Sequence, residues 1–221
     1  ETPRRKQPRK TARGTTQQHV SKGFRLTFFP PLPRFMDFLS LIHKYYADNP
    51  ELENLLLLHS RQVAQRALSI ARKKPELNMD CEFLEEAAML HDIGIFLTDA
   101  PGIGCHGTEP YLLHGFLGAE LMRREGLPRV ARVCERHTGT GLTAERIQEL
   151  NLPLPAGFYE PETLEEKLIC YADKFFSKSH PERERSVADT ARSLEKFGAE
   201  GVKKFLDWAT FFEGEKSLEG E

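Results

Sequence analysis

The sequence predicts an all-α domain, and three observations lead to that prediction. From Met36 onward, apolar residues recur at the spacing of an amphipathic helix almost throughout. Capping residues stand where the predicted helices begin, and glycine or proline stands where they end. No segment shows the alternation of apolar and polar residues that is typical of a half-buried strand. We therefore expect a helical bundle over residues 36–213, preceded by a basic arm, residues 1–35, and followed by a charged tail, residues 214–221.

The first three helices are predicted from apolar stripes and their flanking signals. The first ends at Asn49–Pro50, and a long second helix covers residues 50–73. Asp80 is the predicted N-cap of the third helix, which runs to Ile93 before Gly94 stops or bends it. The apolar faces of the first two helices are Phe38, Leu41, Ile42, Tyr45 and Tyr46, and then Leu52, Leu55, Leu56, His59, Val63, Ala67 and Ile70.

Loops and caps organise the second half of the domain. Residues 97–110, LTDAPGIGCHGTEP, are rich in glycine and proline and predict a loop. Thr143 is expected to cap a short helix, and Thr163 with Glu166 forms a capping box at the start of the helix that carries Asp173. The other helices predicted here cover residues 111–125, Pro128 to about residue 137, 183–197 and 199–212.

Composition describes a globular protein with an uneven distribution of charge. The 221 residues are 39% hydrophobic and 29% charged, and the formal net charge is −2. Residues 1–35 carry a net charge of +8, whereas the residues after them carry −10. We expect the basic arm to be disordered, with binding to nucleic acid or an anionic surface as the alternative.

Cysteine usage and the apolar segments predict a cytoplasmic protein. The four cysteines are widely spaced without a CxxC pair, so we expect reduced thiols rather than a zinc ribbon or a redox motif. No run of about 18 apolar residues predicts a membrane span. No apolar segment typical of a secretory signal follows the early basic residues.

Six residues with metal-binding side chains fall on or beside the apolar faces of these helices. His59 lies three residues after Leu56 and four before Val63, so it is expected to point into the core. His91 lies three residues after Ala88, and the same spacing argument places the others. The full set is His59, His91, Asp92, His114, His137 and Asp173.

Two carboxylates in this set predict a bound cation. An ionised carboxylate in a dry core costs several kcal/mol unless it is paired or bound to a cation. No lysine or arginine is expected on the same faces as Asp92 and Asp173, so a divalent ion is the predicted partner. Mixed imidazole and carboxylate ligands suit Fe, Mn, Zn, Co or Ni. One such histidine alone would be an ordinary core residue; the joint pattern indicates a metal site.

These residues resemble the signature of the HD-domain metal-dependent phosphohydrolases, which is H…HD…D on a helical bundle. His59, the pair His91–Asp92 and Asp173 stand in those positions, and HDIG is the form that names a large subset. The resemblance covers residues 38–178 and implies an HD-type helical bundle. The GYP extension of cyclic-di-GMP phosphodiesterases is not seen.

Two further segments resemble the additional histidine segments of dinuclear HD proteins, including bacterial hydrolases of diadenosine tetraphosphate. They are HGFLGAEL, residues 114–121, and RHTGTG, residues 136–141. The resemblance implies that one ion has four ligands: His59, His91, Asp92 and Asp173. A second ion would share Asp92 and add His114 and His137.

The implied chemistry is hydrolysis of a nucleotide or another small phosphoester. Two ions about 3.5–4 Å apart lower the pKa of a bridging water, and the resulting hydroxide attacks phosphorus in line without a protein nucleophile. His91 and Asp92 would be the central catalytic residues. Candidate substrate contacts are Lys174, which follows Asp173, and also His106, Arg61 and Thr138.

Two alternative functions stay open at this point. HD proteins with the same six ligands include mixed-valent di-iron oxygenases, and an EPR spectrum with metal analysis would separate them from hydrolases. A binding module that docks nucleic acid through the basic arm would show steep salt dependence. The substrate, the metal, the number of ions, the oligomeric state and the status of residues 1–35 are not fixed by the sequence.

Overall fold

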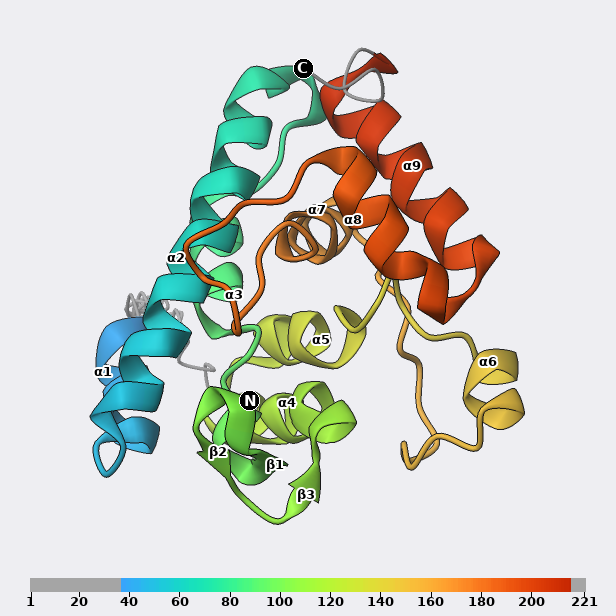
Figure 1. Cartoon of the computed structure of the whole chain (residues 1–221). Coiled ribbons are helices and arrows are strands. Elements are labelled where there is room, and N and C mark those ends of the chain that lie inside the picture. Colours follow the sequence, from blue (N-terminus) through green and yellow to red (C-terminus); the bar gives the residue numbers. More distant parts are fainter. Residues whose placement is uncertain (1–36, 216–221) are drawn as a thin grey trace, which may run out of the picture. The chain divides into compact units, whose positions relative to one another are not determined.

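The computed structural model describes residues 37–215 (Figure 1). The predicted basic arm, residues 1–35, lies outside these residues, as do residues 216–221 of the predicted tail. The chain divides between Phe35 and Met36, and the fold described here is that of the second unit. None of the helices in this described part is long and apolar enough to cross a membrane.

Helices dominate the described residues, and the all-α prediction is confirmed. In chain order they are α1 (Phe38–Tyr46), α2 (Pro50–Lys73), α3 (Cys81–Leu90), α4 (His114–Arg124), α5 (Pro128–Arg136), α6 (Ala144–Glu149), α7 (Leu164–Asp173), α8 (Val187–Leu194) and α9 (Ala199–Glu213). Short 3₁₀ turns cover Pro75–Leu77, Ile95–Leu97, Pro101–Ile103, Tyr111–Leu113 and Glu195–Phe197.

The predicted helix starts are confirmed where a polar side chain caps them. Asp80 accepts a hydrogen bond from the Phe83 amide at 3.0 Å, and Thr143 caps α6 in the same manner. At α7, Thr163 accepts from the Glu166 amide while Glu166 accepts from the Thr163 amide, which completes the capping box. Such caps satisfy amides that have no partner inside the helix, and each stabilises a helix by about 1 kcal/mol.

Two predicted helix starts differ from the observed ones. The helix expected over residues 183–197 begins at Val187, because Ser186 caps it by accepting from the Asp189 amide at 3.0 Å. The helix expected over residues 111–125 opens with a 3₁₀ turn and becomes α-helical at His114.

Helix α7 is the centre of the bundle and appears nearly end-on in the middle of Figure 1. It packs against α2, α3, α5 and α9, so its side chains are buried on most sides. Tyr171 and Phe175 on or just after α7 stack with Phe205 of α9 at ring-centroid distances of 5.1 and 5.6 Å. The buried position of α7 explains how a ligand at its C-terminal end, Asp173, reaches the interior.

Residues 97–110, which the sequence predicted to be a loop, are not wholly irregular. They contain a small sheet of β1 (Thr98–Ala100), β2 (Cys105–His106) and β3 (Glu109–Pro110) in the order β2-β1-β3. Strand β1 pairs antiparallel with β2 and parallel with β3. Strands of two or three residues are too short to show an alternating pattern, so periodicity does not reveal them.

Candidate metal centre

His91 and Asp92 lie at the end of α3 rather than inside a helix. The sequence predicted that this helix runs to Ile93, but it ends at Leu90 and His91 is its C-cap. The backbone then tightens into a turn in which the Ile93 amide donates to the Leu90 carbonyl at 3.0 Å. The Tyr46 hydroxyl donates to the Ile93 carbonyl at 2.8 Å and fixes the turn against α1. The turn redirects the chain, and Asp92 is completely buried.

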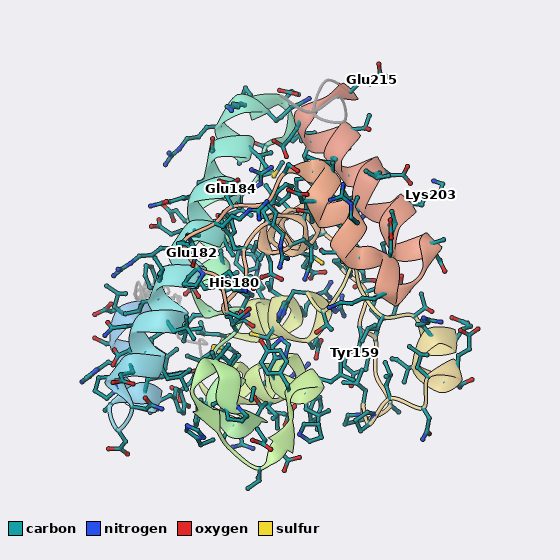
Figure 2. All side chains as sticks on the ribbon, in the orientation of Figure 1. Tyr159, His180, Glu182, Glu184, Lys203 and Glu215 are labelled. Atoms are coloured by element: carbon teal, nitrogen blue, oxygen red, sulfur yellow. The ribbon has the colours of Figure 1, made fainter. Side chains whose placement is uncertain are left out.

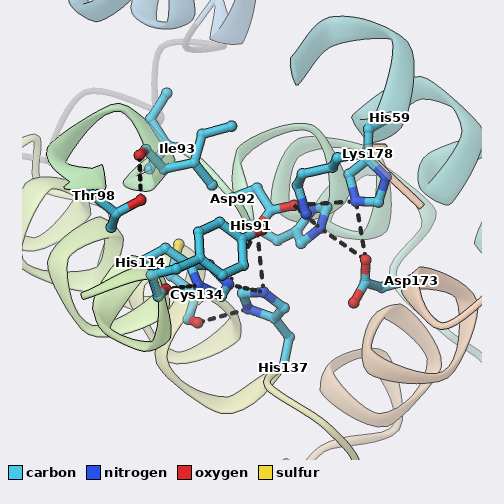
Figure 3. Close-up of polar contacts among 12 residues, drawn as sticks. His59, His91, Asp92, Ile93, Thr98, His114, Cys134, His137, Asp173 and Lys178 are labelled. Atoms are coloured by element: carbon cyan, nitrogen blue, oxygen red, sulfur yellow. Dashed lines mark hydrogen bonds and ion pairs between the residues drawn. The ribbon is translucent and has the colours of Figure 1, made fainter. Parts of the chain in front are cut away.

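Four ligand side chains meet at a first cluster, which is shown in Figure 3. His59 comes from α2, His91 and Asp92 from the end of α3, and Asp173 from the last turn of α7. Nε2 of His59 lies 3.1 Å from Asp92 Oδ2 and 3.0 Å from Asp173 Oδ1. Nε2 of His91 lies 3.0 Å from Asp92 Oδ2 and 3.5 Å from Asp173 Oδ1. Their ligand atoms all lie within 4.8 Å of one another.

A second cluster uses the other oxygen of Asp92. Nε2 of His114, at the start of α4, and Nε2 of His137, just after α5, each lie 3.4 Å from Asp92 Oδ1. The two clusters therefore share one carboxylate, with Oδ2 facing the first and Oδ1 facing the second (Figure 3). The structure thus brings together all six side chains that the sequence singled out.

Three of the four histidines are oriented by the same local hydrogen bond. Nδ1 of His91, His114 and His137 lies 2.7, 2.6 and 2.7 Å from the carbonyl oxygen of the residue three positions earlier. A carbonyl accepts only, so each Nδ1 carries a proton and donates it. This bond fixes the ring and directs Nε2 into the cluster, an arrangement typical of metal-ligating histidine.

The second cluster contains two nitrogen lone pairs that face each other. Nε2 of His114 and Nε2 of His137 are 3.0 Å apart. Burial lowers the pKa of His114 to about 3 and also lowers the pKa of His137, so both rings are neutral near pH 7. Both Nδ1 atoms hold the single proton of a neutral ring, and two lone pairs at this distance repel each other unless a cation binds them. The donor set therefore fits a metal ion.

The first cluster also has buried polar atoms without hydrogen bonds. They are both ring nitrogens of His59, Nε2 of His91 and both oxygens of Asp92. Buried polar atoms are hydrogen-bonded in the great majority of cases, so a group of ring nitrogens and carboxylate oxygens that meet in ion-pair contacts without aligned hydrogen bonds calls for an explanation. A bound cation would satisfy the ligand atoms among them at once.

Charges within the first cluster keep its carboxylates ionised. Burial disfavours the charged form of His91, yet Asp92 and Asp173 raise the pKa of His91 to about 9. Burial also opposes ionisation of Asp92, but the positive charges of His91 and Lys178 hold its pKa well below the usual range. Lys174 and the neighbouring histidines hold the pKa of Asp173 low against the same effect of burial. Both carboxylates are thus anionic at neutral pH, as cation binding requires.

Two lysines lie on these carboxylates, and the expectation that no lysine or arginine shares their surroundings was wrong. Lys174 Nζ donates to Asp173 Oδ2 at 2.5 Å, and Lys178 Nζ lies 2.5 Å from Asp92 Oδ2. Both lysine side chains are only 12% exposed. Both lysines come after the end of α7, where helical spacing no longer predicts the direction of a side chain. The histidine nitrogens, rather than unpaired carboxylates, therefore indicate a metal site.

We predict that Lys178→Met strongly destabilises the protein when metal has been removed by a chelator. The change leaves the buried Asp92 carboxylate without its ammonium partner, which costs about 3–5 kcal/mol. A bound cation would replace that charge, so the loss should shrink when metal is restored. Thermal unfolding with chelator and with added metal measures both effects.

Lys203→Met is the matched control for this prediction. Lys203 projects from the outer side of α9 (Figure 2), and its pair with Asp207 at 2.7 Å is exposed on both sides. Removing such a pair should change stability by less than about 1 kcal/mol. An equal loss of stability in the two variants would contradict the prediction. So would a loss of stability in Lys178→Met that is the same with and without metal.

Comparison with known proteins gives the family. The model of the HD domain family matches residues 56–177, which is more than half of the chain. The chain belongs to the HD domain family. The matched range contains all six side chains of the two clusters.

Curated relatives of this HD domain include longer proteins from archaea. The tRNA (cytidine(56)-2'-O)-methyltransferase of Thermoplasma volcanium is 34% identical over 155 residues, covering 70% of this chain and 40% of that protein. The protein of the same name from Picrophilus torridus is 33% identical over 57% of this chain and 32% of its own length. An uncharacterized protein of Methanocaldococcus jannaschii is 40% identical over 48% of this chain and 56% of its own length. The chain thus spans less than two-thirds of each relative.

Solved structures similar to this HD domain come from the phosphodiesterase PgpH of L. monocytogenes. Its HD domain shares 18% identity, with a TM-score of 0.45, over 78% of this chain and 94% of that chain. The structure of the same domain in complex with cyclic-di-AMP shares 18% identity, with a TM-score of 0.46, over 79% of this chain and 97% of that chain.

A cavity of about 490 Å³ opens beside the two clusters of this HD domain. Its wall includes His114, His137 and Asp173. The charged groups of the wall are four cations and one carboxylate: Lys174, Lys178, Arg185, Lys196 and Asp173. Its hydroxyl groups come from Tyr111, Thr138, Ser177, Ser179 and Ser193. Both its volume and its excess of cations suit a small anionic ligand.

The predicted substrate contacts fall into two groups. Lys174 and Thr138 line this cavity, and Lys174 Nζ also donates to the His137 carbonyl at 2.9 Å. His106 is exposed on β2 and Arg61 is exposed on α2, and neither lines the cavity. The geometry supports a substrate role for the first two residues and gives no support to the last two, whose role stays a prediction.

Sequence reasoning missed Lys178 and Tyr111. Tyr111 lines the cavity, its carbonyl accepts from His114 Nδ1, and its ring stacks on the His114 ring at a centroid distance of 4.7 Å. Burial raises the pKa of the Tyr111 hydroxyl to about 12. Tyr111 stands three residues before a ligand histidine, which is the spacing of the orienting carbonyl. Lys178 carries no comparable signal because it lies in an irregular segment.

Proposed function

We propose that this HD domain is a metal-dependent phosphohydrolase that cleaves a nucleotide or another small phosphoester. The observation that carries the proposal is the position of Asp92. One of its oxygens faces His59 and His91, and the other faces His114 and His137. One carboxylate thus joins two ligand sets beside a cavity lined by cations. This is the arrangement that suits in-line displacement at phosphorus.

Each ligand set would hold one divalent ion, with Fe, Mn, Zn, Co or Ni as candidates. When bound, a pair of such ions supplies Lewis acidity and lowers the pKa of an attached water toward neutrality. The chain itself supplies the rest. His91, His114 and His137 hold fixed ring orientations through Nδ1, and Asp173 completes the first set. Asp92 keeps both sets in a fixed mutual position.

Lys174 and Lys178 would bind the phosphoryl group that is cleaved. Each ammonium lies beside a ligand carboxylate and lines the cavity. Phosphoryl transfer develops charge on the phosphoryl oxygens, and cations placed at that point stabilise it. The lysines therefore complement the histidine clusters, since they face the substrate while the histidines face the ions.

Water, rather than a cysteine thiol, is the proposed nucleophile. Burial raises the pKa of Cys105 and Cys170 to about 11 and raises that of Cys134 still further. Thiols with such pKa values are almost entirely protonated at neutral pH and react poorly. The Cys170 thiol also donates to the His137 carbonyl at 3.4 Å. These cysteines pack the helices that carry the ligands.

The distribution of charge favours a small substrate over a long polynucleotide. The residues that follow the basic arm carry a net charge of −10, and a polyanion would be repelled by most of that surface. Cations gather in the cavity wall instead. The names of two relatives refer to tRNA methylation by proteins of which this chain covers 40% and 32%, so tRNA belongs among the compounds to be tested.

The test is a substrate panel with the full chain loaded with each candidate metal. Mono-, di- and triphosphate nucleosides, cyclic nucleotides, dinucleotides and tRNA would be incubated and their products separated. We expect release of phosphate or of a nucleotide from at least one compound, and loss of that activity in His91→Ala. A protein with both ligand sets filled that leaves the whole panel intact would refute the proposal.

Metal analysis and an EPR spectrum of anaerobically purified protein address the di-iron oxygenase alternative. Full activity with zinc or manganese, and no iron signal, is the result that the hydrolase proposal predicts. A mixed-valent iron signal together with dioxygen-dependent turnover of a compound without phosphate would favour the oxygenase instead.

A further inference from the structure

The positive charges around the cavity are not equivalent. Lys174 pairs with Asp173 and Lys178 pairs with Asp92, in both cases at 2.5 Å, so each ammonium has a carboxylate partner. Arg185 lines the same cavity. Within residues 37–215 no carboxylate pairs with its guanidinium, which donates to the Lys174 carbonyl at 3.5 Å. Arg185 therefore supplies a positive charge that no carboxylate of the described residues neutralises.

The backbone fixes Arg185 close to the metal centre. Its amide donates to the Phe175 carbonyl at 2.9 Å, and its guanidinium reaches the carbonyl of Lys174, the neighbour of the ligand Asp173. The nearby acids are engaged elsewhere or exposed. Glu184 pairs with Arg66 at 2.5 Å, and Glu182 is exposed (Figure 2).

Hydroxyl groups from the same stretch of chain also line the cavity. Ser177 and Ser179 share one hydrogen bond, with their Oγ atoms 3.0 Å apart. Only one of these two hydroxyls can donate in that bond, so the other keeps a proton for a ligand. Ser193 Oγ donates to the Thr190 carbonyl at 2.7 Å and keeps acceptor capacity. A guanidinium and a donor hydroxyl in the wall of one cavity can both bind a phosphate group.

We propose that Arg185, with Ser177 and Ser179, forms a second phosphate subsite next to the metal centre. The inference rests on the proposed function and deepens it. The scissile phosphate lies at Lys174 and Lys178, and a second, non-scissile phosphate lies at Arg185. The substrate class is then a compound with at least two adjacent phosphates, such as a nucleoside polyphosphate, rather than a monoester.

The test compares the binding of inorganic phosphate and inorganic pyrophosphate to the metal-stripped full chain by titration calorimetry. We expect wild type to bind pyrophosphate at least about 10-fold more tightly than phosphate, since one charge-assisted contact is added. Arg185→Gln should remove that advantage, so that the two anions bind with similar affinity. Arg185→Lys keeps the positive charge but loses the planar guanidinium that can donate two parallel hydrogen bonds, so it should retain part of the preference for pyrophosphate.

Arg183→Gln is the matched control, because Arg183 is exposed, pairs with Asp189 at 3.2 Å and does not line the cavity. Thermal unfolding checks that each variant is folded. Equal affinity of wild type for the two anions, or equal behaviour of Arg185→Gln and Arg183→Gln, would overturn the subsite. Pyrophosphate binding that depends on Arg185 in a protein inert across the substrate panel would keep the subsite and refute only the hydrolase proposal.

Discussion

Asp92→Asn is expected to lower the rate of hydrolysis by about 10³-fold and to reduce the metal content from two ions to one or none per chain. Asp92 is the ligand common to both clusters, with Oδ2 within 3.1 Å of two histidines and Oδ1 at 3.4 Å from two others. An amide has one oxygen and no charge, so it serves neither set fully. A loss of about 4 kcal/mol of transition-state stabilisation corresponds to a rate lower by about 10³-fold.

Metal analysis and steady-state rates on the substrate found by the panel measure this effect. Asp99→Asn provides the control, since Asp99 is exposed on β1 and touches neither cluster. That variant should keep both ions and the full rate. If Asp92→Asn kept two ions and a rate within tenfold of wild type, the shared-carboxylate account would be wrong.

Gly94→Ala is expected to lower stability by about 3 kcal/mol, the upper part of the range for overpacking. The backbone of Gly94, with φ −85° and ψ −2°, is open to alanine, so the penalty is steric. A Cβ there would lie 2.3 Å from the His114 carbonyl oxygen and 2.5 Å from the Gly118 amide nitrogen. Both are backbone atoms of α4, so α4 must move away from the turn. His114 would move with it, and binding of the second ion should weaken.

Thermal unfolding should show a fall in Tm of roughly 10 °C for a domain of this size. Gly102→Ala is the matched control, since a Cβ at Gly102 would meet no atom within 4 Å. That variant should lie within about 0.5 kcal/mol of wild type. A Tm for Gly94→Ala within 2 °C of wild type, about the shift for half a kcal/mol, would contradict the close approach of turn and helix.

The convergence of the six candidate ligand residues could be predicted because three of them lie in helices and the other three lie within two residues of a helix end. Register places His59 on the inner face of α2, and Asp173 on the inner face of α7, without any knowledge of tertiary structure. Capping side chains likewise predicted where three helices begin, at Asp80, Thr143 and Thr163. Helical period and capping are local properties, so a single sequence reveals them.

What could not be predicted lies in the irregular segments. Lys178, Arg185 and Ser177 follow the end of α7, where no period relates spacing to direction. The end of α3 was misplaced because the turn after Leu90 is held by a distant hydroxyl, that of Tyr46. Tertiary contacts of this kind cannot be seen in the local spacing of residues. They determine the lining of the cavity more than the positions of the six candidate ligands.

We propose that Asp92 joins two metal ions in one centre. Anomalous diffraction from crystals of the full chain grown with manganese or zinc tests it most directly. We expect two anomalous peaks, one on each side of the Asp92 carboxylate. His59, His91 and Asp173 would contact one peak, and His114 and His137 the other. The absence of any peak at Asp92, or a single peak that His114 and His137 do not contact, would contradict it.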